Sequence, residues 1–287
     1  MKARREPIES YPAPVQRFVE LVRRPANAVP LAEAALEIGR RETPALDVEA
    51  CLDRLETIGR RAVAADPGPA ASAEVRLSAL NEVLFDQEGF AGDREHGDDP
   101  RNSLLHEVLE RRLGLPVTLA VIYLDAGRRT GLDLAGVGMP GHFLVGLRDS
   151  DPPIFIDVFH GGALLDVAGC ARRLHEVTGG QVEMQPEFLR PWTAPRILDR
   201  VLYNLKSAYV RARDFRRARH VMDYILILRP DAPEVVRDRG MLAYQALLFD
   251  QAVEDLERYL ALSPRASDAT AIRGQIQSLR RLLPSTS

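Results

Sequence analysis

The sequence contains few cysteines and no long apolar run. Two of its 287 residues are cysteine, Cys51 and Cys170, which is too few for the disulfide framework of a small secreted domain. The N-terminal segment MKARREP carries the positive charge of a secretory leader, but IESYPAPVQRFVE follows it where an apolar run of roughly 7 to 15 residues is required. No stretch approaches the ~20 apolar residues that cross a bilayer. We therefore expect a soluble cytoplasmic protein with no membrane partner.

The sequence also lacks a large excess of charge of either sign. It has 38 Lys and Arg residues against 41 Asp and Glu residues, so it has no basic excess for binding phosphate backbones. We therefore expect no nucleic-acid partner. Hydrophobic residues make up 46% of the chain, which suffices for one large domain or two of ordinary size.

The first part of the chain reads as helical. From residue 14 to about residue 86 the apolar residues recur at helical spacing, as in Val15, Phe18, Val19 and Val22. A polar segment, DQEGFAGDREHGDDPRN, then interrupts the pattern. Its carboxylates lack the ligand spacing of a calcium loop, so we expect a solvated acidic face.

Two helices are predicted to meet at a tight corner in the middle of the chain. The first runs from about Ser103 to Leu113 and is expected to end at Gly114, since glycine readily adopts a left-handed conformation. The second begins at Pro116, where a missing N–H costs nothing. Because the second helix is apolar on nearly every side, we expect other elements to surround it.

A small antiparallel sheet is predicted after this helix. Beyond Gly131, short runs of Phe, Leu, Val and Ile are divided by Gly, Pro and Asp, and VAGCARRLHEVTG then reads as an amphipathic helix. The prediction for residues 1–190 is thus an α+β fold: a helical N-terminal region, then one central helix against a small sheet.

The last third of the chain repeats itself. Ala218 and Pro230 recur as Ala252 and Pro264, both at an interval of 34 residues, which is the period of a tetratricopeptide (TPR) repeat. Two repeats are visible, and a helix over about 268–283 is expected to cap them. We therefore predict a second, all-α domain over residues 191–287.

Four segments between Leu80 and Asp166 resemble one known family. They are LNEVLFDQEGFAGD, RNSLLHEVLERRLGLPVTLAVIY, GVGMPGHFLVGL and FIDVFHGG, in this order. They are similar to the transglutaminase-like core of the SirB family, a branch of the papain-like cysteine-enzyme superfamily that is usually joined to TPR repeats. The resemblance implies a papain/transglutaminase-like core and a possible role in regulation or protein turnover.

The resemblance also locates a degenerate active site. Active relatives have Gly-x-Cys at the start of the central helix, a His at a strand start and an Asp on the next strand. The matching positions here are Gly114-Leu115-Pro116, His142 and Asp157, so the nucleophile is replaced by proline. A thiol at a helix N-terminus is activated by the dipole and by free N–H groups. Proline supplies neither a thiol nor an N–H.

Nearby residues offer no simple replacement for the missing nucleophile. Thr118 lies two residues further along the helix, which turns its side chain about 200° away from position 116. Cys51 and Cys170 lie in amphipathic helical contexts and are expected to be structural. Asn102 either caps the following helix, which we favour, or points into the cleft.

His142 and Asp157 admit two interpretations. They are either a buried, structural pair or a dyad that activates water, and the sequence does not fix whether they share a face of the sheet. We expect neither a metal ion nor another cofactor, because the histidines lack the paired spacing of a zinc motif. These scattered residues are His96, His106, His142 and His160.

The leading hypothesis from sequence is a non-catalytic scaffold. Its former active-site cleft, lined by Asn102, Pro116, His142 and Asp157, would bind a polypeptide or small ligand. The TPR repeats would offer a second surface for a protein or peptide partner, although they could instead only buttress the first domain. The alternative is an amide, ester or isopeptide hydrolase in which the His142–Asp157 dyad activates water. The oligomeric state does not follow from the sequence.

Overall fold

The computed structural model describes residues 7–283, which form two compact units. The first spans Tyr11–Val201, and the second is formed by the chain from Leu202 onwards together with the short turn η1 (Ile8–Ser10). Each unit is described by itself below. The division after residue 190 stays a prediction.

The first unit begins with helices that follow the predicted apolar spacing. Asp47 caps the longest of them by accepting a hydrogen bond from the Ala50 N–H (3.0 Å), and Ser72 caps another at the Val75 N–H (3.4 Å). The expected helical N-terminal region is confirmed. It comprises α1 (Ala13–Val22), α2 (Leu31–Gly39), α3 (Val48–Ala65), α4 (Ala73–Asn81) with its π-helical continuation η2 (Glu82–Gln87), the turn η3 (Pro100–Ser103) and α5 (Leu105–Arg111).

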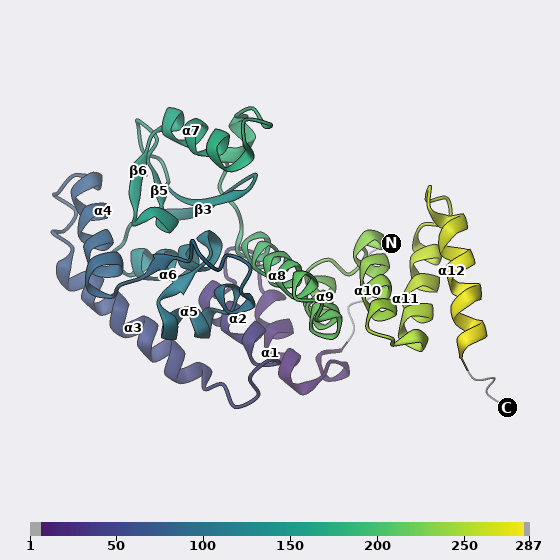
Figure 1. Cartoon of the computed structure of the whole chain (residues 1–287). Helices are drawn as coiled ribbons and strands as arrows, with labels where there is room; N and C mark the ends of the chain where they lie inside the picture. The colour runs from purple at the N-terminus through teal and green to yellow at the C-terminus, as the bar shows by residue number, and fades with distance from the viewer. Residues whose placement is uncertain (1–6, 284–287) are drawn as a thin grey trace. The chain divides into compact units, whose positions relative to one another are not determined.

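The centre of the first unit is one helix packed against a four-stranded sheet. Helix α6 (Pro116–Arg129) starts at the predicted proline and is buried along most of its length. Figure 1 shows the sheet between α6 on one side and α7 (Val167–Thr178) on the other. The predicted α+β core with a small antiparallel sheet is therefore confirmed. The strands, in spatial order, are β3 (Leu134–Met139), β4 (His142–Leu147), β5 (Phe155–Asp157) and β6 (Ala163–Leu165).

The corner before α6 differs from the prediction. Helix α5 ends at Arg111, and the next residue, Arg112, adopts the left-handed conformation (φ 65°). Leu113–Gly114 then forms strand β2, parallel to β1 (Ala91–Gly92). Gly114 is instead required by close packing. A Cβ atom there would lie 2.9 Å from Val108 Cγ1 and 3.2 Å from Thr118 Oγ1.

The acidic segment before this corner is only partly a solvated face. Glu88 and Asp93 are buried, with 9% and 5% of their surfaces exposed. Glu88 forms ion pairs with Arg61 and Arg112, while Asp93 accepts hydrogen bonds from the side chain of Asn102 and the backbone of His96. The expectation fails for these two residues because cationic and amide partners offset their desolvation.

The second unit is a stack of antiparallel helices. Ala218 and Ala252, which recur at an interval of 34 residues, are both fully buried, as expected of repeat packing positions. The two predicted helix pairs and the final helix are confirmed. They are α8 (Ala194–Arg211), which belongs to this unit from Leu202 onwards, with α9 (Phe215–Leu228), α10 (Pro233–Gln245) with α11 (Phe249–Leu262), and α12 (Ala269–Leu282). In Figure 1, α10, α11 and α12 lie side by side.

Candidate functional site

The sheet register places His142 and Asp157 on one face. Val145 of β4 pairs with Ile156 of β5, so continuing the register sets Leu144 opposite Asp157. Residues two apart on a strand share a face, and directly opposite residues do so as well. His142 is therefore a diagonal neighbour of Asp157. The two side chains share a face of the sheet, a point that the sequence left open.

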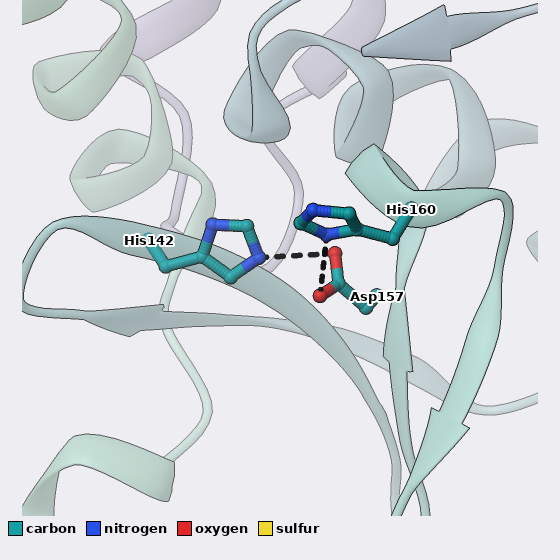
Figure 2. Close-up of side chains that lie close together, drawn as sticks. All are labelled: His142, Asp157 and His160. Atoms are coloured by element: carbon teal, nitrogen blue, oxygen red, sulfur yellow. Dashed lines mark hydrogen bonds and ion pairs between the residues drawn. The ribbon is translucent and has the colours of Figure 1, made fainter. Parts of the chain in front are cut away.

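Asp157 holds two imidazoles at once. Nε2 of His142 lies 3.0 Å from Oδ1 of Asp157, and Nδ1 of His160 lies 2.9 Å from Oδ2 of the same carboxylate. Figure 2 shows both rings directed at this carboxylate. As a carboxylate only accepts hydrogen bonds, both ring nitrogens donate to it, which fixes the orientation of each imidazole.

The sequence interpretation missed His160. It follows Asp157 by three residues and belongs to η4 (Val158–His160), a 3-10 turn. Side chains three residues apart are eclipsed in a 3-10 helix, so the spacing in DVFH was the signal that could have found it.

An arginine and an aromatic ring complete this cluster. Nε of Arg173, from α7, lies 2.9 Å from Oδ2 of Asp157, but it is not directed for a hydrogen bond. The Phe159 ring meets His142 edge-on, with ring centroids 6.2 Å apart, and meets His160 in the same way at 5.2 Å. The carboxylate is therefore surrounded by cationic or polar nitrogens, and an aromatic ring packs against both imidazoles.

The environment of the cluster biases its protonation. Burial by itself would raise the pKa of Asp157, but the hydrogen bond and charge of His142, joined by those of His160, hold it below its usual value. Burial lowers the pKa of His160, against the opposing attraction of the Asp157 carboxylate. Near neutral pH the arrangement therefore favours an ionised carboxylate beside a neutral His160.

The turn after His160 is fixed by Asn81 from α4. The Asn81 amide donates to the carbonyl of Gly162 (2.8 Å) and its side-chain oxygen accepts from the Tyr123 hydroxyl of α6 (2.9 Å). Gly162 has φ +76°, and a Cβ atom there would lie 2.3 Å from Oδ1 of Asn81. Glycine is required here on both grounds. The position of η4, and with it His160, is thus tied to α4 and α6.

The start of α6 carries no reactive group in the structure. Pro116 occupies the first helical position and has no N–H to offer. The Thr118 hydroxyl is already engaged, since it donates to the carbonyl oxygens of Asn102 (2.7 Å) and Leu115 (3.0 Å) and accepts from the Leu115 N–H (3.0 Å). No side chain of the predicted Gly-Leu-Pro corner replaces the nucleophile.

Phe159 connects the histidine cluster with this corner. Gly92 of β1 pairs with Gly114 of β2, two residues before Pro116. A Cβ atom on Gly92 would lie 2.4 Å from Cδ2 of Phe159. The Phe159 ring therefore fills the space beside Gly92 and also makes the T-shaped contact with His142.

The preferred sequence interpretation of Asn102, that it caps the next helix, is wrong. The N-cap of α5 is Leu104, and Asn102 lies inside η3, which Asp99 caps. The Asn102 amide donates to Asp93 (3.0 Å) and to the His96 carbonyl (2.8 Å), while its oxygen accepts from Arg111 (3.0 Å). Its side chain is committed to this loop, and only its backbone carbonyl reaches the start of α6.

Both cysteines lie within helices and not at the start of α6. Cys51 is half-buried in α3 and Cys170 is fully buried in α7. Burial raises the pKa of Cys170 to about 12, and burial also raises the pKa of Cys51. Neither thiol has the electropositive setting of a nucleophile.

The structure thus brings together some of the predicted site residues and not others. His142 and Asp157 are in contact, with 3% and 0% of their surfaces exposed, and His160 adds a side chain that is 24% exposed. Asn102 is also fully buried, but its side chain belongs to a separate network around Asp93. Pro116 is half-buried at the start of α6.

Comparisons with known proteins cover both units. Residues 49–203 match the model of the transglutaminase-like superfamily, and residues 205–277 match that of a tetratricopeptide repeat. A UPF0162 protein from Xylella fastidiosa is 37% identical over 256 residues, which span 88% of this chain and 91% of that protein. A UPF0162 protein from Pseudomonas aeruginosa is 31% identical over 258 residues, or 90% and 92% of the two chains.

A longer relative shares only part of the chain. F-box only protein 21 from Homo sapiens is 30% identical over 171 residues, which are 56% of this chain and 26% of that protein. Within residues 7–283, no helix combines the length and apolar character that a membrane crossing needs. The match over more than half of the chain, together with near full-length relatives, shows that this chain belongs to the transglutaminase-like superfamily, alongside the UPF0162 proteins and with a TPR region after its core.

Proposed function

We propose that this protein is a non-catalytic, transglutaminase-like scaffold of the SirB type that acts in the cytoplasm by binding a polypeptide or small ligand. In this proposal residues 1–190 supply a degenerate active-site cleft around Pro116, His142 and Asp157, and residues 191–287 supply a second contact surface. The observation that carries the proposal is Pro116 at the first position of α6. It has neither a thiol to attack a carbonyl nor an N–H to stabilise an oxyanion.

The remaining polar groups support a binding role over catalysis. Thr118 uses its hydroxyl for hydrogen bonds within the corner, and both thiols are helical residues with raised pKa values. His142 and Asp157 are buried and directed at each other. A base and its orienting carboxylate without a nucleophile make an incomplete hydrolytic site.

The TPR region is proposed as an interaction surface without the clamp used for carboxyl-terminal peptides. The positions that hold Lys and Asn in clamping relatives resemble Tyr203 and Ser207 here. The Tyr203 hydroxyl accepts a hydrogen bond from Arg229 (3.1 Å), and the Ser207 hydroxyl donates to the Tyr203 carbonyl (2.8 Å). Binding by this surface therefore needs contacts other than a carboxylate clamp.

The hydrolase alternative is favoured by one observation, the 3.0 Å contact between His142 and Asp157. A broad panel of amide, ester and isopeptide substrates distinguishes the two functions. We expect no turnover by the purified protein. Turnover that disappears in His142→Ala and persists in His175→Ala, a change of an exposed histidine on α7, would establish the hydrolase and end the scaffold proposal.

The binding half of the proposal needs its own measurement. Peptides selected from a random display library should bind the protein and lose affinity when His160, the accessible edge of the cluster, is changed to alanine. His175→Ala serves as the matched control and should bind as well as the parent protein. A protein that selects no peptide and no small ligand from such libraries contradicts the scaffold function.

A further inference from the structure

His142, Asp157 and His160 form the strongest unassigned feature of the molecule. Metal ligands in proteins are mostly His, Cys, Asp and Glu. Within residues 7–283, these three residues are the one group of at least three such side chains whose ligand atoms all lie within 4.8 Å of one another. We propose that these three residues bind a divalent transition-metal ion, with zinc as the representative ion. This inference goes beyond the scaffold function, which does not depend on an ion.

The donor set suits such an ion. Imidazole is a borderline ligand and carboxylate a hard one, and a set of two imidazoles with one carboxylate favours zinc, iron or cobalt over magnesium and calcium, which take mainly oxygen ligands. Each imidazole now directs a ring N–H at the Asp157 carboxylate, at 3.0 Å from His142 and 2.9 Å from His160. An ion would bind the nitrogens that now carry these protons, each neutral imidazole would carry its proton on the other ring nitrogen, and small side-chain shifts would bring the donors to the ~2.0–2.2 Å of zinc bonds.

The surrounding fold holds the three donors in place. His142 and Asp157 lie on hydrogen-bonded neighbouring strands, and the turn after His160 is fixed by the hydrogen bond from Asn81 to Gly162. His160 is the most accessible of the three donors, with 24% of its side chain exposed. Three protein donors leave at least one coordination position for water or a ligand atom.

The positive charge of Arg173 opposes the binding of a cation at this site. Its Nε lies 2.9 Å from the Asp157 carboxylate without forming a hydrogen bond, and its guanidinium also pairs with Glu176, whose side chain is 60% exposed. A carboxylate can serve several partners at once. Arg173 can therefore remain near Glu176 while Asp157 binds the ion, but its charge weakens the attraction.

The exposed loop around His96 places a second histidine beside a carboxylate, so adventitious binding there has to be distinguished from binding at the proposed site. The His96 side chain is 72% exposed and its Nδ1 lies 3.7 Å from Asp93. Asp93, however, is already engaged by Asn102 and by the backbone N–H of His96. His96→Ala therefore separates binding at this loop from binding at the proposed site.

The experiment uses the tag-free, full-length protein, stripped of metal and titrated with Zn²⁺ by calorimetry, with Mg²⁺ as the comparison ion. We expect one Zn²⁺ per chain, no saturable Mg²⁺ binding, and an absorption band of tetrahedral Co²⁺ that Zn²⁺ displaces. His160→Ala should lower the Zn²⁺ affinity by at least about 100-fold, which exceeds the usual cost of losing an outer-shell partner. His96→Ala and His175→Ala should leave it unchanged.

Arg173→Met provides a test that a folding defect cannot mimic. Removing the competing charge should raise the Zn²⁺ affinity by about three- to tenfold. Absence of saturable Zn²⁺ binding, or an affinity that is unaltered in His160→Ala or abolished in His96→Ala, overturns the proposal. If the Zn²⁺ affinity is unchanged in Arg173→Met and lost in His160→Ala, the result still supports the three proposed ligands. These outcomes are independent of substrate turnover and of peptide binding, so the scaffold function is judged separately.

Discussion

Each unit buries an aspartate, and the partners of the two aspartates differ. In the TPR unit, Asp255 is 2% exposed and is bound through both oxygens by Arg239, which also reaches Asp223 (2.9 Å). In the transglutaminase-like unit, Asp157 is fully buried beside two imidazoles and a poorly directed arginine.

The difference separates a structural group from a candidate site. A guanidinium keeps its charge at all ordinary pH values and matches a carboxylate geometrically, so Asp255 is locked between helices. Imidazoles can exchange a proton for another electrophile. Of Asp157 and Asp255, Asp157 is the one whose partners can change.

Thiol reactivity gives the largest expected effect, and both cysteines lie in the transglutaminase-like unit. With the pKa of Cys170 at about 12, its thiolate fraction at pH 8 is about a thousandfold below that of a free thiol. Alkylation of the native protein should leave Cys170 unmodified and modify Cys51 slowly, as read by mass spectrometry. Both should react fully in urea. Rapid native modification of Cys170 would contradict its structural role.

Removing either Asp157 or Asp255 should destabilise the unit that contains it. Asp157→Ala and Asp255→Ala each leave cationic or polar partners without a counter-charge, at a cost of about 3 kcal/mol in the free energy of unfolding. Urea unfolding measures the loss, and native-state hydrogen exchange locates it in one unit. Asp133→Ala removes only an exposed pair with Arg148 and should cost less than about 1 kcal/mol. Equal effects of all three changes would contradict the argument.

Two glycines offer a packing comparison between the units. Gly92→Ala places a Cβ atom 2.4 Å from the Phe159 ring, whereas Gly240→Ala places one 3.0 Å from Asp255 Cβ. We expect a loss of about 2 kcal/mol for the first change. The second should alter stability by less than about 1 kcal/mol, because the gain in helix propensity offsets the closer contact. Thermal unfolding of both variants is the measurement, and the reverse order would show that Phe159 moves freely.

Acid titration gives the smallest expected effect and applies to both units. The pKa of Asp93 is lowered, because hydrogen bonds from His96 and Asn102 outweigh its burial, and that of Asp268 is lowered mainly by the Tyr259 hydroxyl. A lowered folded pKa stabilises the protein above the ordinary carboxyl value of about 3.9 and loses this contribution as the pH falls. Asp93→Asn and Asp268→Asn should each flatten the acid limb of stability against pH. An unchanged limb would contradict the assignment.

Local patterns predicted much of the fold but not its corners. Apolar spacing located the helices of the first unit, and the interval of 34 residues located the two helix pairs of the second. The end of α5 was misplaced because Gly114 suggested a left-handed residue, whereas Arg112 takes that conformation and Gly114 is needed for close packing. The sequence pattern predicts a cap at Asn102 and misses its real partner, Asp93, because folding alone brings these residues, nine apart in the chain, together.

The sequence by itself determined that position 116 lacks both a thiol and an N–H, since these are covalent properties of proline. Only the tertiary structure decided that His142 shares a face with Asp157 and that His160 meets the same carboxylate. Strand register sets the first contact, between residues 15 apart in the chain, and a 3-10 turn sets the second, between residues three apart. The apolar pattern specifies neither the register nor the turn. Composition states which groups exist, whereas the fold decides which of them lie within bonding distance.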